Sequence, residues 1–378
     1  MPPIYLDCNA STPIDPAVFD AMRPWLVNDF GNSSSRTHEF GLKAKRAVAL
    51  ARKQIASAFG VDQEEVVFTS GATESNNLAI LGLASWGEQT GRKHLITSAM
   101  EHSAVLEPIA WLRDNAGFSV TELPASSDGI IDPDDLRRSL RPDTALVSLM
   151  QVNNETGVIQ PLRELAIVLT DHPAYFHVDA AQGFGKEFTE ISARRIDLIS
   201  CTGHKIYGPQ GIGALVVKRT HERPIPLKPL TFGGGHERGL RPGTLPTHLI
   251  VGFGSAASLA VADHKARESK NRSFRKQLFE GLDGLPLTTH GAPNLVIPHV
   301  TNLSIDGVSS EAAMVALRQY IAISNGSACS SAKYEPSHVL RAMGLSNEQL
   351  DGAMRFSWCH LTPEVDWRAV RALLAEFL

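Results

Sequence analysis

Residues 197–211 read Asp197-Leu-Ile-Ser-Cys-Thr-Gly-His-Lys-Ile-Tyr-Gly-Pro-Gln-Gly211. The apolar run Leu198–Ser200 predicts a buried strand, and Tyr207-Gly-Pro209 turns the chain sharply. Lys205 lies between them, at the mouth of the strand. An amine in this position can attack a carbonyl and form a Schiff base, provided that burial or neighbouring cations lower its pKa. A single lysine in a loop is more commonly just solvated. Other residues of the chain must therefore show whether Lys205 forms a Schiff base.

Predicted strands and helices alternate on both sides of this segment. Most of the strands are short apolar runs without polar alternation, which is typical of strands covered on both faces. Helical segments between most of them predict a mainly parallel sheet, and therefore an α/β fold. The expected strands are Val66–Thr69, His94–Ser98, Ser119–Leu123, Ala145–Met150, Tyr175–Asp179, Leu198–Cys201 and Ala214–Val217.

The chain has 378 residues, which is enough for two domains. We predict a large domain over residues 16–260, and a smaller α+β domain from residues 1–15 and 261–378. A long helical stretch, Leu245 to about Leu282, is expected to lead out of the large domain. The other elements predicted in the small domain are strands near Thr301–Ile305 and Met354–Trp358 and helices near Ser310–Gln319, Ser337–Met343 and Pro363–Phe377.

The composition is that of an ordinary soluble globular protein, with 43% hydrophobic and 20% charged residues. A net charge of −4 provides no electrostatic reason to expect direct nucleic-acid binding. No apolar run approaches a membrane span and the N-terminus lacks a secretory signal, so we expect a cytoplasmic protein without membrane association. The cysteines form no C-x-x-C pair, and we expect free thiols and no metal site. They are Cys8, Cys201, Cys329 and Cys359.

Gly71, Ala72 and Thr73 lie between a predicted strand and a predicted helix. Small residues there leave backbone N–H groups and the Thr73 hydroxyl directed at a common point, where the helix dipole favours an anion. A plain capping box, Ser70-x-x-Thr73-Glu74, explains the same residues about equally well.

Asp179 ends a predicted strand, and Gln182 follows three residues later. They place a carboxylate and an amide at the carboxyl edge of the sheet, where open α/β sheets bind ligands. The carboxylate could pair with a protonated ring nitrogen, or it could cap the next helix. A Schiff-base lysine (Lys205), a pyridinium partner and a phosphate cup at Gly71–Thr73 are what pyridoxal phosphate requires of a protein.

Further motifs are spread over nearly the whole chain. They are Tyr5-Leu-Asp7, Thr12-Pro13, Gly31-Asn32, Thr69-Ser-Gly-Ala-Thr-Glu-Ser75, Glu101-His102, Val152-Asn-Asn-Glu155, His177-Val-Asp-Ala180, Gly203-His-Lys-Ile-Tyr-Gly-Pro209, Gly233-Gly-Gly-His-Glu-Arg238, Gly243-Thr244, Gly326-Ser-Ala-Cys329 and Arg355-Phe-Ser357. The motifs and their order along the chain resemble those of the class V aminotransferase family, and within it those of the cysteine desulfurases of the NifS/IscS kind. The resemblance implies a fold-type I enzyme that uses pyridoxal 5'-phosphate.

The resemblance also implies a role for each matching position. Lys205 would carry the cofactor, Asp179 would hold its ring nitrogen and Gln182 its phenolic oxygen. His102 would stack on the ring and move protons.

The remaining implied roles concern the phosphate and the substrate. Thr244 would reach the phosphate from the partner subunit of a homodimer, and Asn154 and Arg355 would hold the substrate carboxylate. An arginine offers a planar fork suited to a carboxylate. The phosphate ligands implied within the same chain are Gly71, Ala72, Thr73, Thr202 and His204.

Cys329 lies in a run of small polar residues, Ser324–Lys333, within a loop of about residues 324–336. Such a loop should be mobile enough to carry a thiol into and out of a pocket. A single cysteine is usually a small buried hydrophobe, but this polar setting argues against that role. The resemblance implies that the Cys329 thiolate attacks the sulfur of cofactor-bound L-cysteine. The products would be L-alanine and a Cys329 persulfide, whose sulfur passes to an acceptor protein.

The acceptor and the substrate leave alternatives open. The chain ends at Leu378 without the extension that housekeeping members use to dock an iron–sulfur scaffold, and the Ser35–Ala47 segment resembles desulfurases that serve DNA phosphorothioation (DndA-like). Iron–sulfur assembly and tRNA thiolation remain other pathways. Trp358-Cys359 departs from the family pattern and leaves fine specificity open. Other readings are a selenocysteine lyase, a small-amino-acid aminotransferase, or a non-catalytic binding protein of the same fold.

Overall fold

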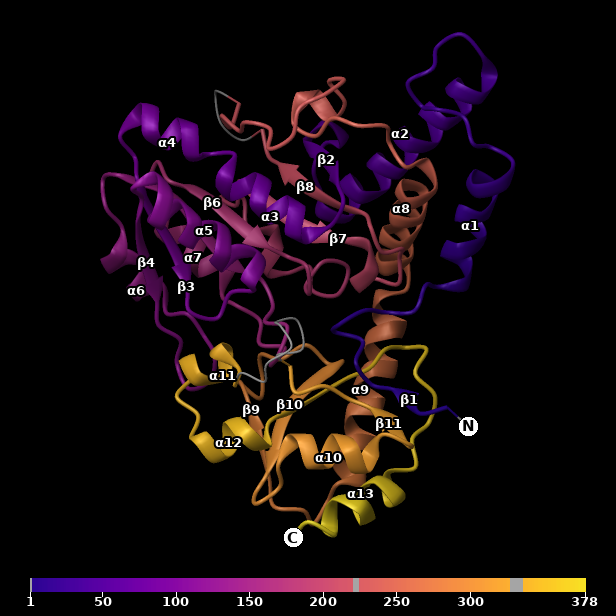
Figure 1. Cartoon of the computed structure of the whole chain (residues 1–378), viewed down its shortest axis with the longest axis vertical. Coiled ribbons are helices and arrows are strands. Elements are labelled where there is room, and N and C mark those ends of the chain that lie inside the picture. Colours follow the sequence, from indigo (N-terminus) through magenta and orange to yellow (C-terminus); the bar gives the residue numbers. More distant parts are fainter. Residues whose placement is uncertain (1, 220–223, 327–335) are drawn as a thin grey trace.

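A computed structural model describes residues 2–219, 224–326 and 336–378, and its larger part is built on a seven-stranded sheet (Figure 1). β8 runs antiparallel to both of its neighbours, whereas the other pairings are parallel. Each strand predicted for this sheet is present to within one residue at either end. The order across the sheet is β2 (Val66–Thr69), β8 (Gly213–Val217), β7 (Leu198–Thr202), β6 (Tyr175–Asp179), β5 (Thr144–Met150), β3 (His94–Ser98) and β4 (Ser119–Leu123).

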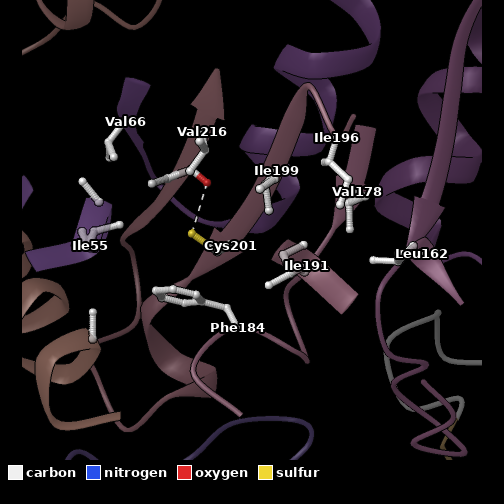
Figure 2. Close-up of a cluster of buried hydrophobic side chains, with 14 of the residues drawn as sticks. Ile55, Val66, Leu162, Val178, Phe184, Ile191, Ile196, Ile199, Cys201 and Val216 are labelled. Atoms are coloured by element: carbon white, nitrogen blue, oxygen red, sulfur yellow. Dashed lines mark hydrogen bonds between the residues drawn. The ribbon is translucent and has the colours of Figure 1, made fainter. Parts of the chain in front are cut away.

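Both faces of this sheet are covered by helices, so successive strand residues enter different apolar cores. Leu198 packs into the core beneath α3 and α5, whereas Ile199 and Cys201 enter the core on the opposite face. Figure 2 shows this second core, with the Cys201 thiol 3.5 Å from the Ala214 carbonyl oxygen. Burial on both faces is the reason that these strands lack polar alternation. The helices of the larger part are α1 (Pro16–Val27), α2 (Glu39–Phe59), α3 (Ala72–Leu81), α4 (Ala84–Thr90), α5 (Ser103–Ala116), α6 (Pro133–Ser139), α7 (Leu162–Val168) and α8 (Thr247–Ala262).

The smaller part contains short sheets and its own apolar core, and lies at the bottom of Figure 1. The chain start returns to it, because β1 pairs with β11 in parallel. A separate core supports the proposed division into residues 16–260 and residues 1–15 plus 261–378. Across the described ranges, no helix combines the length and apolarity needed to span a bilayer. The elements are β1 (Ile4–Tyr5), α9 (His264–Gly281), β9 (Leu287–His290), β10 (Val300–Ile305), α10 (Ser310–Leu317), β11 (Ile321–Ala322), α11 (His338–Ala342), α12 (Asn347–Gly352), β12 (Met354–Ser357) and α13 (Trp367–Ala375).

The helical stretch predicted from Leu245 to about Leu282 is divided into two helices, α8 and α9. The chain leaves helical geometry at Asp263, where φ is −97° and ψ is 5°, so α8 ends and α9 begins. The Arg267 guanidinium donates to Asp263 at 3.4 Å and to Asp15, the N-cap residue of α1, at 3.2 Å. This break depends on a distant residue, and the sequence around it contains neither proline nor glycine to mark it.

Candidate active site

A cavity of about 530 Å³ opens at the carboxyl ends of β5, β6 and β7. It gathers most of the residues that the sequence analysis selected, from segments far apart in the chain. These are Gly71, Ala72, Thr73, His102, Asn154, Asp179, Gln182, Thr202, His204, Lys205 and Arg355. It is also lined by residues that the sequence analysis did not select, including Asn9, Ala10, Ser11, Asn76 and Gln210.

Lys205 enters the cavity from a short 3₁₀ turn, Gly203–Lys205, directly after β7. A side chain at Gly203 would place its Cβ 2.9 Å from the Pro209 carbonyl oxygen, so this tight turn requires glycine. The Lys205 ammonium donates to the carbonyl oxygens of Asn9 and Ala10, the latter at 2.7 Å. The segment around Asn9 therefore positions the lysine, a role that no motif in the sequence indicated.

Asp179 is almost completely buried at the end of β6. One carboxylate oxygen accepts from the Asn76 amide at 2.7 Å, and the other accepts from the Ala181 backbone N–H at 2.9 Å. The second bond closes a turn directly after β6, where no helix begins, so Asp179 does not cap a helix; the first bond holds the carboxylate at the cavity. Asn76 was missed, although a buried polar residue on α3 is a signal that could have indicated it.

Two histidines line the cavity, and their contacts determine where each imidazole carries its proton or whether it is charged. His102 is the N-cap of α5, and its Nδ1 accepts from the Ala104 N–H at 3.0 Å. The neutral ring therefore carries its proton on Nε2. Burial, with help from Lys205 and Lys186, lowers the pKa of His204 to about 4, so this imidazole is neutral at pH 7.

The Gly71–Thr73 corner opens α3 toward the same cavity. The Glu74 carboxylate accepts from the Ser70 N–H at 2.6 Å, so part of the predicted capping box is present. The first N–H groups of a helix have no partners within the helix, and those of Ala72 and Thr73 are therefore suited to an anion. The bond between Ser70 and Glu74 does not use these two N–H groups.

Arg355 reaches the cavity from β12 in the smaller part, and only 3% of its surface is exposed. Its guanidinium donates to Asp7 at 2.6 Å and to the Asn154 carbonyl oxygen at 3.1 Å. The buried Nε has no hydrogen-bond partner within the described part of the chain. These contacts hold a planar cation with remaining donor capacity at the cavity wall.

The family model described as Aminotransferase class-V matches residues 4–369. The chain belongs to this family. The cysteine desulfurase IscS of Methylococcus capsulatus is 46% identical over 365 residues, which cover 96% of this chain and 89% of that protein. Such relatives extend over nearly the whole chain, so it is a pyridoxal-phosphate-dependent cysteine desulfurase.

Solved structures show the same fold. The structure of DndA from Streptomyces lividans is 48% identical, with a TM-score of 0.83, and the match covers 93% of this chain and 98% of that one. A structure described as SspA in complex with cysteine is 37% identical, also with a TM-score of 0.83, and covers 95% and 100% of the two chains. The α/β fold predicted for this desulfurase is confirmed.

The cavity residues fit the cofactor of the family. Lys205 supplies an amine, Asp179 an anion for a protonated ring nitrogen, and the start of α3 donors for a phosphate. The Gln182 amide donates to the Asn9 carbonyl oxygen at 2.9 Å through one end, and its buried Oε1 has no partner in the described structure. An orphaned polar atom in a cavity wall is suited to a polar ligand.

Two predicted site residues remain to be compared with this cavity. Thr244 is exposed and does not line it. Cys329 lies outside the described residues. Described residues on both sides of it in the sequence lie beside Glu155. The Ser337 hydroxyl donates to the Glu155 carboxylate at 2.6 Å, and a Cβ on Gly326 would be 3.0 Å from the same oxygen.

Substitution of Arg355 by lysine should raise the KM for L-cysteine roughly tenfold to a hundredfold, because a lysine cannot reproduce the fork that Asp7 and Asn154 hold. Steady-state kinetics over a range of L-cysteine concentrations would measure this. Arg275→Lys is a matched control, since Arg275 donates to the Val300 carbonyl oxygen away from the cavity. An unchanged KM in Arg355→Lys would exclude the substrate role.

Glu101 is buried beneath the site and accepts from the Ser98 hydroxyl at 2.6 Å and the Met150 N–H at 3.0 Å. Burial raises the pKa of its carboxyl from 4.5 to about 8. Between these pH values the folded protein holds a proton that the unfolded chain has released. The free energy of unfolding should therefore fall as pH rises from about 4.5 to about 8.

Glu101→Gln should weaken this pH dependence, because the amide stays neutral throughout. Guanidinium unfolding at two pH values within the window would measure the change in the free energy of unfolding for each protein. Glu122→Gln, on the exposed side of β4, serves as the control. If wild type and Glu101→Gln lose equal stability as the pH rises, the buried carboxyl is not neutral at pH 7.

Proposed function

We propose that this desulfurase transfers the sulfur of L-cysteine to Cys329 as a persulfide, and from there to an acceptor protein. The observation that carries the proposal is the convergence of Lys205, Asp179 and Arg355 on one cavity. A lysine, a buried carboxylate and a carboxylate-binding arginine are what an enzyme acting on an amino acid through pyridoxal phosphate needs.

Each side chain has one task in this proposal. When bound, pyridoxal phosphate supplies an aldehyde for the substrate amine and a ring that withdraws electrons from the substrate's Cα. Arg355 binds the carboxylate of L-cysteine and orients it. Asp179, held by Asn76, keeps a proton on the ring nitrogen, and His102 moves protons through Nε2. Lys205 anchors the cofactor.

Cys329 performs the sulfur chemistry. Its thiolate attacks the sulfur of the bound substrate, a new S–S bond forms, and the bond between sulfur and Cβ breaks. The carbon fragment is released as L-alanine after protonation. An acceptor thiol then attacks the outer sulfur of the persulfide and restores the Cys329 thiolate.

Incubation of the purified protein with L-cysteine and a reductant tests the proposal. Alanine and sulfide should appear in equal amounts. Selenocysteine lyase activity predicts turnover of L-selenocysteine with negligible turnover of L-cysteine, and a non-catalytic binding protein predicts neither product. The likeness to a cysteine desulfurase and to a structure that holds cysteine favours neither of those two functions nor an aminotransferase.

We further propose a homodimer with shared sites. A second hollow, of about 740 Å³, shares Thr73 and His102 with the cavity and includes the exposed Trp111. The turn before Thr244 is anchored by Glu237, whose buried carboxylate accepts from Arg52 at 2.5 Å. The hollow beside the cavity and the anchored turn before Thr244 are both consistent with a Thr244 of the partner subunit that approaches the site through this hollow. Sedimentation analysis should find a dimer, and a fully active monomer would exclude this arrangement.

The acceptor belongs to one of three pathways. The likeness to DndA favours DNA phosphorothioation, while the likeness to IscS keeps iron–sulfur assembly and tRNA thiolation in consideration. We propose a cytoplasmic protein that gives sulfur to a protein partner and does not bind nucleic acid itself. Candidate acceptors mixed with the labelled persulfide form would identify the partner by the label that they acquire.

A further inference from the structure

Cys8 and Cys359 lie against each other in a buried cluster that Tyr207 closes. Their exposed fractions are 2% and 5%. The two chain segments run side by side, since Asp7 pairs with Ser357 and the Cys8 N–H donates to the Ser357 carbonyl oxygen at 3.0 Å. The bridge between Asp7 and Ser357 therefore brings the turn that begins at Cys8 and the segment that ends at Cys359 into the same cluster. Neither cysteine has a part in the proposed desulfurase reaction.

The closeness of the two thiols raises the pKa of Cys8 and lowers that of Cys359. The Thr362 hydroxyl also donates to the Cys359 sulfur, at 3.6 Å, and the Lys186 amine, whose pKa burial lowers to about 7, lies close to both sulfurs. Cys359 is therefore the better nucleophile of the pair, and Cys8 is placed to react with it next.

We propose that Cys8 and Cys359 are a peroxide-sensitive pair that closes into a disulfide and weakens substrate binding. The Cys359 thiolate attacks one oxygen of hydrogen peroxide, the O–O bond breaks, and hydroxide leaves, so that Cys359 becomes a sulfenic acid. The Cys8 sulfur then attacks the Cys359 sulfur, the S–O bond breaks and water leaves. Both sulfurs are oxidised by one electron each, and a dithiol reductant reverses the change.

The position of Cys8 connects this disulfide to the active site. Its neighbour on one side, Asp7, accepts from Arg355, and its neighbour on the other side, Asn9, accepts from Lys205 and Gln182. A covalent bond at residue 8 ties the turn between Asp7 and Asn9 to Cys359, and we expect this constraint to displace the two acceptors.

Disulfide mapping tests the proposal without relying on turnover. The Cys329→Ser holoenzyme is treated with hydrogen peroxide, its free thiols are alkylated, and it is digested without reduction for mass spectrometry. We expect a peptide that joins Cys8 to Cys359, formed in most molecules and lost after treatment with dithiothreitol. Cys201 should remain a free thiol, since it lies in the sheet core apart from the pair (Figure 2).

Substrate affinity provides the second readout, from the change in cofactor absorbance as L-cysteine binds to the Cys329→Ser protein. Oxidation should weaken binding roughly tenfold, the effect of misplacing one charge-assisted hydrogen bond. Cys8→Ser and Cys8→Ala should bind L-cysteine as the parent does and should not respond to peroxide. The proposal is overturned if Cys8 and Cys359 remain separately alkylated after oxidation, or if the disulfide forms without any loss of affinity.

Discussion

Cys329→Ser should reduce the formation of alanine and sulfide from L-cysteine by roughly a thousandfold or more, while the protein keeps its bound cofactor. The reason is chemical, because a hydroxyl stays protonated at neutral pH and attacks sulfur far less readily than a thiolate does. The assay measures both products in the presence of reductant, together with the visible absorbance of the cofactor.

Cys201→Ser is the matched control for Cys329. A serine there can still donate to the Ala214 carbonyl oxygen, which the Cys201 thiol contacts in the core (Figure 2). This variant should turn over L-cysteine as wild type does. Undiminished activity in Cys329→Ser would refute the persulfide mechanism, even with the family membership unchanged.

Lys205→Ala should lose the absorbance band of covalently held cofactor and reduce desulfurase activity by roughly a thousandfold or more. No other amine lines the cavity in the described part of the chain, so another lysine cannot readily take over. Borohydride should fix the cofactor irreversibly to wild type and leave Lys205→Ala unlabelled, which mass spectrometry of the intact proteins would show.

The control for this variant is Lys276→Ala, because the Lys276 side chain is 77% exposed on α9. It should keep full activity and cofactor labelling. Covalent labelling of Lys205→Ala at the wild-type level would place the cofactor on a different lysine and remove Lys205 from its proposed role.

The fold was predictable largely because its strands are covered on both faces. Leu198 and Ile199 enter different cores, so the strand reads as an uninterrupted apolar run between turn residues. The break at Asp263 was not predictable in the same way. An ion pair between Arg267 and Asp15 accompanies the break. The sequence around Asp263 does not indicate that Arg267 pairs with a residue about 250 positions earlier in the chain.

Some residues of the candidate site were likewise predictable from the local sequence, and others were not. Lys205, Asp179 and the Gly71–Thr73 corner each follow a strand, and the carboxyl ends of parallel strands meet at one edge of a sheet, so their convergence could be predicted. The supporting groups could not. Asn76 and the carbonyl oxygen of Asn9 reach the site only through packing between elements.

For Lys205, the residue types around it and their order along the chain were sufficient to predict the cofactor and the place where it binds. Tertiary structure decided how the lysine is held, because the carbonyl oxygens that accept from its ammonium belong to Asn9 and Ala10, which lie 196 and 195 residues earlier in the chain. It likewise decided that Cys8 and Cys359 meet. Contacts between residues so far apart depend on how the elements pack, and that packing leaves no periodic or local pattern in the sequence.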